Sequence, residues 1–403
     1  MNILFLHPNF PAQFKHIATH LARDNNNDVK FICETHYGRR IKGVELIVST
    51  KKDGKESKTN GPVNENIENF NRAKRYRKCF AALENTKKWT PDIIVSHCGW
   101  GCGLHAKEIW PLSYNISYIE WWFSPQSELT QALQNNPNLK FGEKTMMNLW
   151  QRNLPMSFEL INADKIISPT EWQKAQFPMQ IQKACDVIYD GIDRDIYKPD
   201  KNLRSKVPLI TYGTRGMEPI RGFPNFIKTL PLIIRRMPNV RIQIAGIDEV
   251  CYGGRKPKSG TWGQWAKSYL DKHGVAKNIE WLGRLSPDKY TNWLKSSWCH
   301  VYLTEPYVLS WSFLEAACSG APIVVNQSGA IEEFADESDL SGIFKCSSLD
   351  HNELASTIEG VLKNERRWDY AALSSAGIGA KVDLERTMEQ WRRITDVDPT
   401  TQR

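Results

Sequence analysis

Short apolar stretches alternate with amphipathic stretches along this chain, and the pattern starts again half-way. The first half opens with a predicted strand over residues 3–6 and a helix over residues 13–22, and a further apolar strand covers residues 91–96. The second half restarts with a strand over residues 208–212 and a helix over residues 223–236. Such alternation is typical of βαβ units, which build mainly parallel sheets. The sequence therefore predicts an α/β chain.

A charged segment separates the two halves. It runs from about residue 195 to residue 207, contains Pro199 and lacks apolar periodicity, as a linker does. We therefore expect one Rossmann-like domain over residues 1–195 and a second over residues 205–383, with a last helix at 384–403 that packs back on the first. Ligands bind at the carboxyl ends of parallel strands, so two such sheets facing a central cleft would suit a two-substrate transferase.

Composition excludes several classes of protein. The mean hydropathy is −0.49 and no apolar run approaches 18 residues, which argues against a membrane-spanning helix. Hydrophobic residues make up 41% of the 403 residues, enough to exclude general disorder. The start, MNILFLHPNF, has no basic region and is interpreted as a first strand, not a signal peptide. Nine cysteines without disulfide-like spacing favour reduced thiols in a cytoplasmic protein.

Positive charge is concentrated between residues 38 and 88. This stretch holds 14 Lys and Arg against 6 Asp and Glu, a local excess of +8 that equals the net charge of the chain. A polar loop is expected over residues 49–66, followed by a basic helix over residues 66–88. Its apolar face is predicted from Ile67, Phe70, Ala73, Tyr76, Phe80 and Leu83, and its basic face from Arg72, Lys74, Arg75, Arg77 and Lys78.

Two interpretations of this helix stay open. It is either a solvated helix face or a peripheral contact with an anionic membrane or a phosphorylated lipid carrier at the inner membrane face. Nucleic acid is not expected as a partner, because no recognisable binding motif accompanies the charge.

A glycine-rich turn after the strand at 208–212 is the first candidate site. Residues 212–222 read YGTRGMEPIRG, in which Gly213 and its neighbouring glycines allow backbone to approach a ligand. Arg215 and Arg221 lie six residues apart, and both can reach one diphosphate beside a helix N-terminus.

A second motif follows the predicted strand at 300–303 and opens another helix. Residues 303–316 read LTEPYVLSWSFLEA. Ser310 or Ser312 can cap this helix, whose free N–H groups attract an anion. Glu315 is placed to accept the two hydroxyls of a ribose, although a surface Glu that favours the helix dipole would look the same.

The spacing of these motifs resembles the retaining family 4 glycosyltransferases of the GT-B fold. In that family a Gly-Arg…Lys-Gly loop holds the donor diphosphate, and a Glu-x7-Glu segment binds the donor sugar and nucleotide. Arg215 matches the loop arginine, Arg221 takes the place of the lysine and Glu315 matches the second glutamate. Residues 328–332, SGAIE, resemble the family's Gly-Gly-Ile-Pro-Glu turn.

The first glutamate of the family motif is missing. Tyr307 stands eight residues before Glu315, and Glu305 lies two positions earlier. Two possibilities stay open: Tyr307 takes a different part, with Ser310 and Trp311 near the sugar, or Glu305 reaches into the site.

The first half resembles the family more loosely. The loop after the first strand is similar by position to the acceptor-side loop, which implies acceptor contacts for His7, Phe10 and Gln13; an ordinary strand-to-helix turn is an equal alternative. His97 and Glu120 follow two later strands, and Glu120 looks like the counterpart of a histidine near the reacting sugar. Both are candidate catalytic residues, with a buried bonded histidine and a capping glutamate as the structural alternatives.

The resemblance implies transfer of a hexose from a nucleotide-sugar donor to a hydroxyl acceptor with retention, an EC 2.4 activity in glycan, polysaccharide or glycolipid biosynthesis. Arg215 and Arg221 would then act catalytically on the leaving diphosphate, without a metal or another cofactor. The acceptor is lipid-linked, anionic or neither, and the donor sugar and base stay open. A nucleotide-sugar epimerase of the same fold, or a non-catalytic nucleotide-sugar-binding subunit, is the alternative.

Two other patterns are given structural interpretations. Cys98 and Cys102 form a C-x3-C pair with no second pair, so buried free thiols are favoured over a zinc site. The basic segment that starts at Tyr252 is either a lid over the donor or a surface insertion, and the insertion is slightly favoured.

Overall fold

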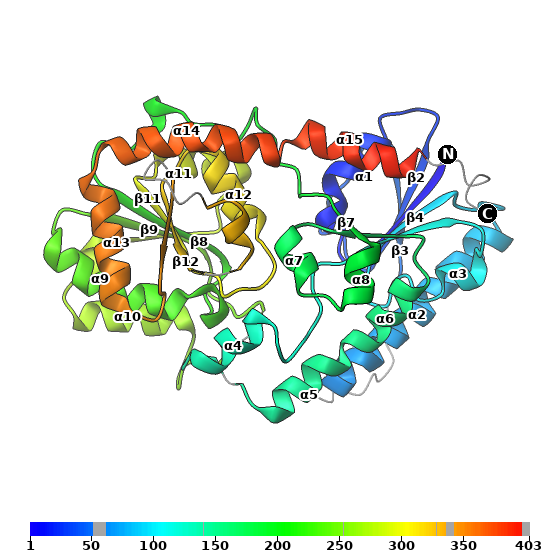
Figure 1. Cartoon of the computed structure of the whole chain (residues 1–403), viewed down its shortest axis with the longest axis horizontal. Coiled ribbons are helices and arrows are strands. Elements are labelled where there is room, and N and C mark those ends of the chain that lie inside the picture. Colours follow the sequence, from blue (N-terminus) through cyan, green and yellow to red (C-terminus); the bar gives the residue numbers. More distant parts are fainter. Residues whose placement is uncertain (51–61, 140, 253, 328, 336–341, 397–403) are drawn as a thin grey trace. The chain divides into compact units, whose positions relative to one another are not determined.

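The computed structural model describes residues 1–50, 62–139, 141–252, 254–327, 329–335 and 342–396 (Figure 1). The chain divides into two compact units. The first consists of Met1–Pro125, Gly142–Gly191 and the segment from Leu384 onward, and the second of Gln126–Phe141 and Ile192–Asp383. The polypeptide thus passes through the second unit at residues 126–141 and returns to the first.

A seven-stranded parallel sheet forms the centre of the first unit. Its strand order is β3-β2-β1-β4-β5-β6-β7, and every neighbouring pair is parallel. The strands are β1 (Asn2–Leu6), β2 (Asp28–Cys33), β3 (Val44–Val48), β4 (Ile93–His97), β5 (Tyr114–Tyr118), β6 (Lys165–Ser168) and β7 (Cys185–Val187). The order reverses between β1 and β4, as in a doubly wound Rossmann-like sheet.

Helices cover both faces of this sheet. They are α1 (Lys15–Leu21), α2 (Pro62–Asn85), α3 (Ala106–Ile109), α5 (Glu143–Gln151), α6 (Asn153–Ile161), α7 (Glu171–Ala175), α8 (Met179–Ala184) and α15 (Leu384–Thr395). One face packs on α1 and α15, where Trp391 joins the core around Phe5 and Phe31. The other face packs on α2 through Tyr76 and Phe80. Figure 1 shows α15 lying along α1.

The second unit repeats the architecture with six parallel strands. Its strand order is β10-β9-β8-β11-β12-β13, which again reverses beside the first strand of the unit. The strands are β8 (Leu209–Gly216), β9 (Arg241–Ile247), β10 (Ile279–Gly283), β11 (Cys299–Tyr302), β12 (Ile323–Asn326) and β13 (Ile343–Cys346). The helices are α4 (Glu128–Asn135), α9 (Phe223–Arg236), α10 (Trp262–Lys272), α11 (Pro287–Ser296), α12 (Trp311–Cys318), α13 (His351–Lys363) and α14 (Arg366–Lys381).

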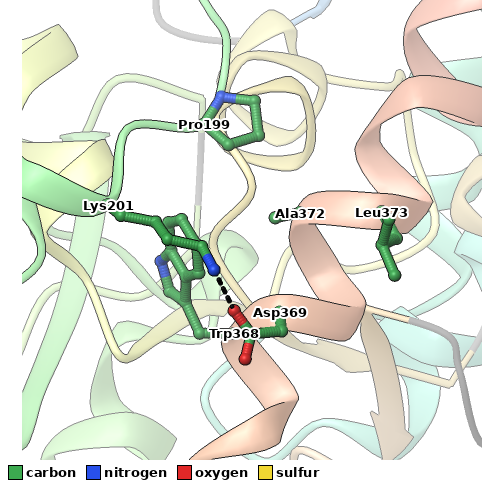
Figure 2. A pocket seen from close by; sticks show the side chains of 6 residues that line it. All are labelled: Pro199, Lys201, Trp368, Asp369, Ala372 and Leu373. Carbon is green, nitrogen blue, oxygen red and sulfur yellow. Dashed lines mark ion pairs between the residues drawn. The ribbon is translucent and has the colours of Figure 1, made fainter.

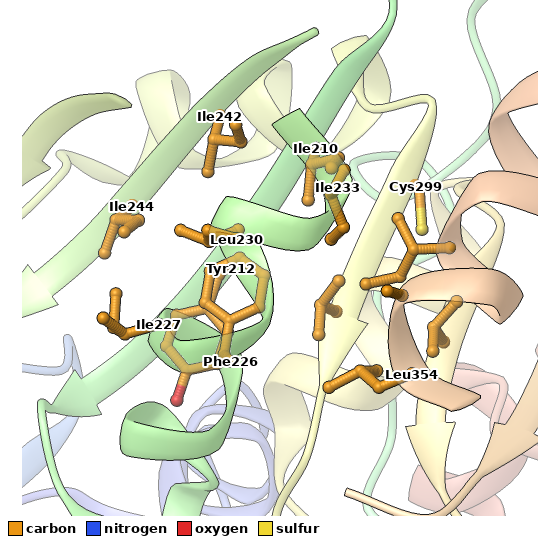
Figure 3. Packing of buried hydrophobic residues seen from close by; sticks show 14 of the residues in the cluster. Ile210, Tyr212, Phe226, Ile227, Leu230, Ile233, Ile242, Ile244, Cys299 and Leu354 are labelled. Carbon is orange, nitrogen blue, oxygen red and sulfur yellow. The ribbon is translucent and has the colours of Figure 1, made fainter. Parts of the chain in front are cut away.

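The core of the second unit supports the glycine-rich turn (Figure 3). Tyr212 of β8 stacks on Phe226 of α9, with ring centroids 4.7 Å apart and planes at 12°. The Tyr212 hydroxyl reaches the end of the turn and donates a hydrogen bond of 2.8 Å to the Arg221 carbonyl oxygen. Apolar packing therefore fixes the backbone that carries Arg221.

The basic helix differs from the expectation in which side chains it buries. Ile67 and Phe70, expected on the packed face, are exposed. Arg72, expected on the solvated face, is buried and pairs with Glu34 at 3.2 Å. The reason is the carboxylate of Glu34, which follows β2 and forms an ion pair with Arg72. Helical periodicity cannot reveal a partner so distant in the sequence. Most of the expected loop at 49–66 lies outside the described residues, and α2 already begins at Pro62.

Among the described residues, no helix combines the length and the apolar character that crossing a lipid bilayer demands. All nine cysteines are free thiols, and Cys98 and Cys102 are both buried.

Candidate functional site

The candidate residues gather where the strand order of each sheet reverses. In open α/β sheets this reversal leaves a crevice at the carboxyl ends of the strands, in which ligands bind. In the first unit His7 follows β1 and His97 ends β4. In the second unit Arg215 lies at the end of β8 and Thr304 follows β11. Each unit therefore carries one site at the position that its topology favours.

The site of the second unit is a polar pocket of about 190 Å³. It is lined by Tyr212, Gly213, Thr214, Arg215, Arg221, Tyr252, Tyr302, Leu303, Thr304, Ser310 and Ser312. Both arginines of the first motif and both serines of the second thus meet at one place. A pocket with two guanidinium groups and several hydroxyls is suited to an anionic, hydrogen-bonding ligand.

Both guanidinium groups contact Tyr252. The guanidinium carbon of Arg221 lies 4.7 Å from the centre of the Tyr252 ring, and that of Arg215 lies 5.8 Å from it. Arg215 also donates to the Tyr252 hydroxyl at 3.3 Å, and Arg221 donates to Thr304 Oγ1 at 3.2 Å. Cation–π contacts of this kind hold a guanidinium in place beside the pocket.

Gly222 explains how Arg221 comes so close to β11. Its backbone adopts φ +70°, and a Cβ atom there would lie 2.4 Å from Leu303 Cβ and 2.6 Å from the Leu303 carbonyl oxygen. Only glycine fits this left-handed position against the strand end. The glycine after Arg221 is therefore required by packing.

The N-terminus of α12 completes the pocket. Ser310 is its N-cap, and Ser310 Oγ accepts a hydrogen bond of 3.4 Å from the Ser312 amide. The Ser310 and Ser312 hydroxyls lie 2.8 Å apart. The positive end of the helix dipole therefore lies among the serines that line the pocket, and it favours an anion there.

The other predicted donor residues lie near this pocket without lining it. Within the described residues, Glu315, Tyr307 and Trp311 are absent from the pocket wall, and all three are half-buried. Burial raises the pKa of Tyr197, and the adjacent Glu315 carboxylate raises it further. The Glu315 carboxylate therefore faces phenol groups, and its assignment to a ribose stays a prediction.

Glu305 lies inside the second unit. Its Oε1 accepts a hydrogen bond of 2.6 Å from the Asn136 side chain, which follows α4, and its amide donates to the Ile220 carbonyl oxygen at 2.9 Å. Burial raises the pKa of Glu305 to about 7, although the Asn136 hydrogen bond opposes the shift. Glu305 thus joins the α4 segment to the residue before Arg221.

The first unit builds its own polar cluster around Glu120. Nε2 of His97 lies 3.0 Å from Glu120 Oε2, and Nε2 of Gln13 donates to both Glu120 oxygens at 3.1 Å. The side chain of Gln173 donates to the Glu120 carbonyl oxygen at 2.7 Å. Gln13, expected at the acceptor position, and His97, expected at the catalytic position, therefore share the carboxylate of Glu120, whose side chain stays 20% exposed.

The hydrogen bonds of His97 favour its charged form. Nδ1 lies 2.9 Å from the Cys98 carbonyl oxygen, while Nε2 faces Glu120. A carbonyl and a carboxylate oxygen only accept, so both ring nitrogens donate when the imidazole is protonated. Burial lowers the pKa of His97, but the hydrogen bond and charge of Glu120 outweigh it and raise the pKa above its ordinary value.

His7 lies against His97, and its surroundings favour the neutral form of its ring. The centroids of the two imidazole rings are 5.3 Å apart, and the ring planes are nearly perpendicular. Burial lowers the pKa of His7 well below its ordinary value, and the charge of His97 lowers it further. Phe10 packs on Phe31 in the hydrophobic core and is only 1% exposed, so the structure gives its ring a packing contact.

Two family models match the chain in succession. The glycosyl transferase family 4 group matches residues 25–197, and the glycosyl transferases group 1 family matches residues 193–376. The chain belongs to the group 1 glycosyltransferases. This confirms the family and the transferase class (EC 2.4) expected from the two arginine and serine motifs.

Solved structures share the fold of this glycosyltransferase. Sucrose-phosphate synthase of Thermosynechococcus elongatus is 12% identical, with a TM-score of 0.72 over 98% of each chain. HepE of Anabaena is 14% identical, with a TM-score of 0.70 over 98% of this chain and 100% of that one. WaaG, a glycosyltransferase of lipopolysaccharide biosynthesis, is 14% identical, with a TM-score of 0.70 over 99% and 100%. The expected pair of Rossmann-like domains, the GT-B fold, is confirmed. No curated protein matches the chain by sequence.

Sequence reasoning about this glycosyltransferase missed Tyr252 and Glu159. Tyr252 belongs to the segment for which a lid over the donor and a surface insertion were both considered, with the insertion slightly favoured, and its place after β9, next to β8, was the available signal. Glu159 of α6 is buried near His97. Burial raises the pKa of Glu159 to about 8, although a hydrogen bond from the Gly103 backbone and the charge of His97 oppose this shift. A Cβ at Gly103 would lie 2.6 Å from Glu159 Oε2, a close approach that no local pattern announces.

A larger open hollow of about 390 Å³ lies elsewhere in the second unit (Figure 2). It is lined by Pro199, Lys201, Trp368, Asp369, Ala372 and Leu373. Lys201 pairs with Asp369 at 2.9 Å across it, which leaves no excess of charge. None of the predicted site residues lines it, and we assign it no part in transfer.

Proposed function

We propose that this glycosyltransferase moves a hexose from a nucleoside diphosphate sugar to a hydroxyl acceptor with retention of anomeric configuration. The observation that carries the proposal is the convergence of Arg215 and Arg221 on one pocket beside the N-terminus of α12. Two fixed cations and a helix N-terminus are suited to a diphosphate. The pocket of the second unit is thus assigned to the donor.

In the proposed reaction the bond between the anomeric carbon and the diphosphate oxygen breaks while the acceptor oxygen bonds to that carbon. Negative charge grows on the leaving diphosphate, and Arg215, Arg221 and the α12 amides stabilise it. The chain's own cations take this role in the proposal, so no metal or other cofactor is assigned. The acceptor hydroxyl gives its proton to the leaving diphosphate, so the products are the glycoside and the nucleoside diphosphate.

The cluster around Glu120 is assigned to the reacting sugars. Its carboxylate is partly exposed and is held by Gln13 and His97, so its orientation is fixed before a ligand binds. A carboxylate held in this way can accept a hydrogen bond from a sugar hydroxyl, and the His97 imidazolium balances its charge. His7 is the neutral neighbour that borders the cluster.

Uridine diphosphate sugars are the first donors to test. HepE of Anabaena, which shares the fold, was solved with UDP-glucose, and WaaG acts in lipopolysaccharide biosynthesis. By this likeness we propose a UDP-hexose donor and an acceptor in glycan, polysaccharide or glycolipid synthesis.

The decisive experiment measures donor binding and then turnover. Thermal shift with UDP-, GDP- and ADP-sugars should raise Tm for one base, since a ligand that binds only the folded state stabilises it. Transfer to a panel of saccharide acceptors, with the anomeric product assigned by NMR, then tests retention. Epimerised sugar formed from donor alone would favour an epimerase, and nucleotide binding without turnover on any acceptor would favour a binding subunit.

A further inference from the structure

Helices α5 and α6 expose a continuous row of large apolar side chains. Met147, Trp150, Leu154, Phe158 and Ile161 are each between 52% and 81% exposed. Their spacing of three or four residues places all five on one helical face. A soluble surface rarely leaves so many large apolar groups together without a partner.

The two helices form one nearly continuous rod. Arg152 stands between them with φ −64° and ψ −21°, so the backbone stays helical across the junction. The opposite face of α6 is buried, where Met156 and Leu160 join a hydrophobic cluster of the first unit. The helix is therefore apolar on two sides, and the folded unit covers only one of them.

The neighbouring helix α2 exposes further apolar side chains and positive charge. Asn66 of α2 donates to the Gln151 carbonyl oxygen at 2.9 Å, which places the two helices side by side. Ile67 and Phe70 of α2 are exposed next to this contact, and Lys74 and Lys78 continue the same face.

The cationic character of this surface rests on lysines. On the first exposed turn of α5, Lys144 precedes Met147 by three residues and is exposed. Arg72 and Arg75 of α2 take no part, because they turn inward to Glu34 at 3.2 and 2.6 Å. The structure thus separates the exposed Lys74 and Lys78 from the inward-turned Arg72 and Arg75.

We propose that this face, formed by Ile67, Phe70, Lys74 and Lys78 of α2 and by Lys144, Met147, Trp150, Leu154, Phe158 and Ile161 of α5 and α6, docks on an anionic lipid bilayer. Interfacial helices insert an apolar row that contains Trp and Phe among the lipid headgroups, while flanking lysines meet the anionic phosphates. The positive charge of the lysines and the length of the apolar row favour a lipid bilayer over a protein as the partner. Docking is independent of the proposed donor chemistry.

The test is cosedimentation of the full chain with phosphatidylcholine vesicles, with and without phosphatidylglycerol. The wild type should bind the anionic vesicles and release them as salt rises. Leu154→Gln with Phe158→Gln should lower the bound-to-free ratio about tenfold or more, because both side chains lose apolar contact. The Lys74→Gln/Lys78→Gln double variant should bind the anionic vesicles more weakly. Its binding to vesicles of phosphatidylcholine only should not change.

Matched controls use exposed residues of the second unit. Leu373→Gln removes a large exposed apolar side chain from α14, and Lys289→Gln removes an exposed lysine from α11; both should bind as the wild type does. A cooperative thermal unfolding transition near the wild-type Tm confirms that each variant is folded. Equal binding by the Leu154/Phe158 double variant, or no binding by the wild type, overturns the proposal. The proposal is also overturned if the wild type sediments as a dimer that the Leu154/Phe158 double variant converts to a monomer, while neither protein binds vesicles.

Discussion

Nε2 of His97 and Oε2 of Glu120 lie 3.0 Å apart, although the two residues leave different strands. His97 ends β4, and its register partner on β5 is Tyr118, two residues before Glu120. The parallel pairing of β4 with β5 therefore brings the imidazole and the carboxylate together. Burial of the His97 ring, with a carbonyl oxygen at the other ring nitrogen, makes the charge of His97 depend on Glu120.

The first prediction concerns Glu120→Gln, which should lower the pKa of His97, because the hydrogen bond and the charge of Glu120 are the largest contributions that oppose burial. The measurement is an NMR titration of the His97 ring, with the exposed His273 as an internal reference. In the wild type the folded pKa of His97 is raised above its unfolded value. The stabilisation by Glu120 is therefore complete below about pH 6.5 and is lost as the pH rises through the folded pKa.

The same variant should lose stability in a pH-dependent way. The expected loss in the free energy of unfolding is about 2 kcal/mol at pH 6 and less at pH 9, since a charged hydrogen bond is removed only where His97 is charged. Urea unfolding at both pH values measures it. Equal losses at the two pH values would show that the pair does not hold His97 in its charged form.

The second prediction concerns Arg221→Ala. Removal of one preorganised donor to the leaving diphosphate should reduce kcat/KM by about 100- to 1,000-fold. Stability should change little, because the side chain contacts Thr304 and Tyr252 at the wall of the pocket and not the hydrophobic core. Steady-state transfer kinetics and Tm are measured together, with the exposed Arg284→Ala as control. Unaltered transfer by Arg221→Ala would remove the proposed donor site.

The third prediction separates the ring of Tyr252 from its hydroxyl. Tyr252→Ala should weaken donor binding about tenfold, because both guanidinium groups lose the aromatic face that holds them. Tyr252→Phe keeps the ring and loses only the 3.3 Å contact with Arg215, so it should bind nearly as the wild type does. Calorimetric titration with UDP compares the two. A phenylalanine variant as weak as the alanine variant would assign the effect to the hydroxyl.

Local sequence was informative where one segment carries both the fold and the chemistry. The turn that holds Arg215 and Arg221 follows a strand directly, so its place and its charge could be predicted together. The pairing of His97 with Glu120 could not, because it depends on which strands become neighbours. The same reason hid Tyr252, which reaches the pocket from the end of β9.

The charge pattern misled because its partners are distant in sequence. Arg72 and Arg75 look like one solvated row with Lys74, yet both turn inward to Glu34 after β2. Helical periodicity assigns a residue to a face but does not reveal what covers that face. The grouping of residues 126–141 with the second unit is a further long-range outcome: Asn136 contacts Glu305, 169 positions away.

The fourth prediction tests the packing of the last helix. Trp391 of α15 is buried in the core of the first unit, so Trp391→Ala should cost about 3–5 kcal/mol in the free energy of unfolding. Its neighbour Arg392 is exposed and pairs with the exposed Asp396 at 3.2 Å, so Arg392→Ala should change stability by less than about 0.5 kcal/mol. Urea unfolding of both variants makes the comparison. Similar small losses would mean that α15 is not held by the core.

The fifth prediction concerns the buried carboxyl of Glu305, whose pKa is raised to about 7 from an ordinary value of 4.5. The folded protein therefore holds this proton more tightly than the unfolded chain, and stability should fall as the pH rises from about 4.5 to about 7. Glu305→Gln keeps an acceptor for Asn136 and does not titrate. Relative to the wild type, this variant should gain up to about 3 kcal/mol in the free energy of unfolding between pH 4.5 and pH 8. Urea unfolding across this range measures the gain, with the exposed Glu249→Gln as control. Parallel stability curves for Glu305→Gln and the wild type would mean that Glu305 is ionised in the folded protein, in which case the junction between Asn136 and the Arg221 turn carries a charge.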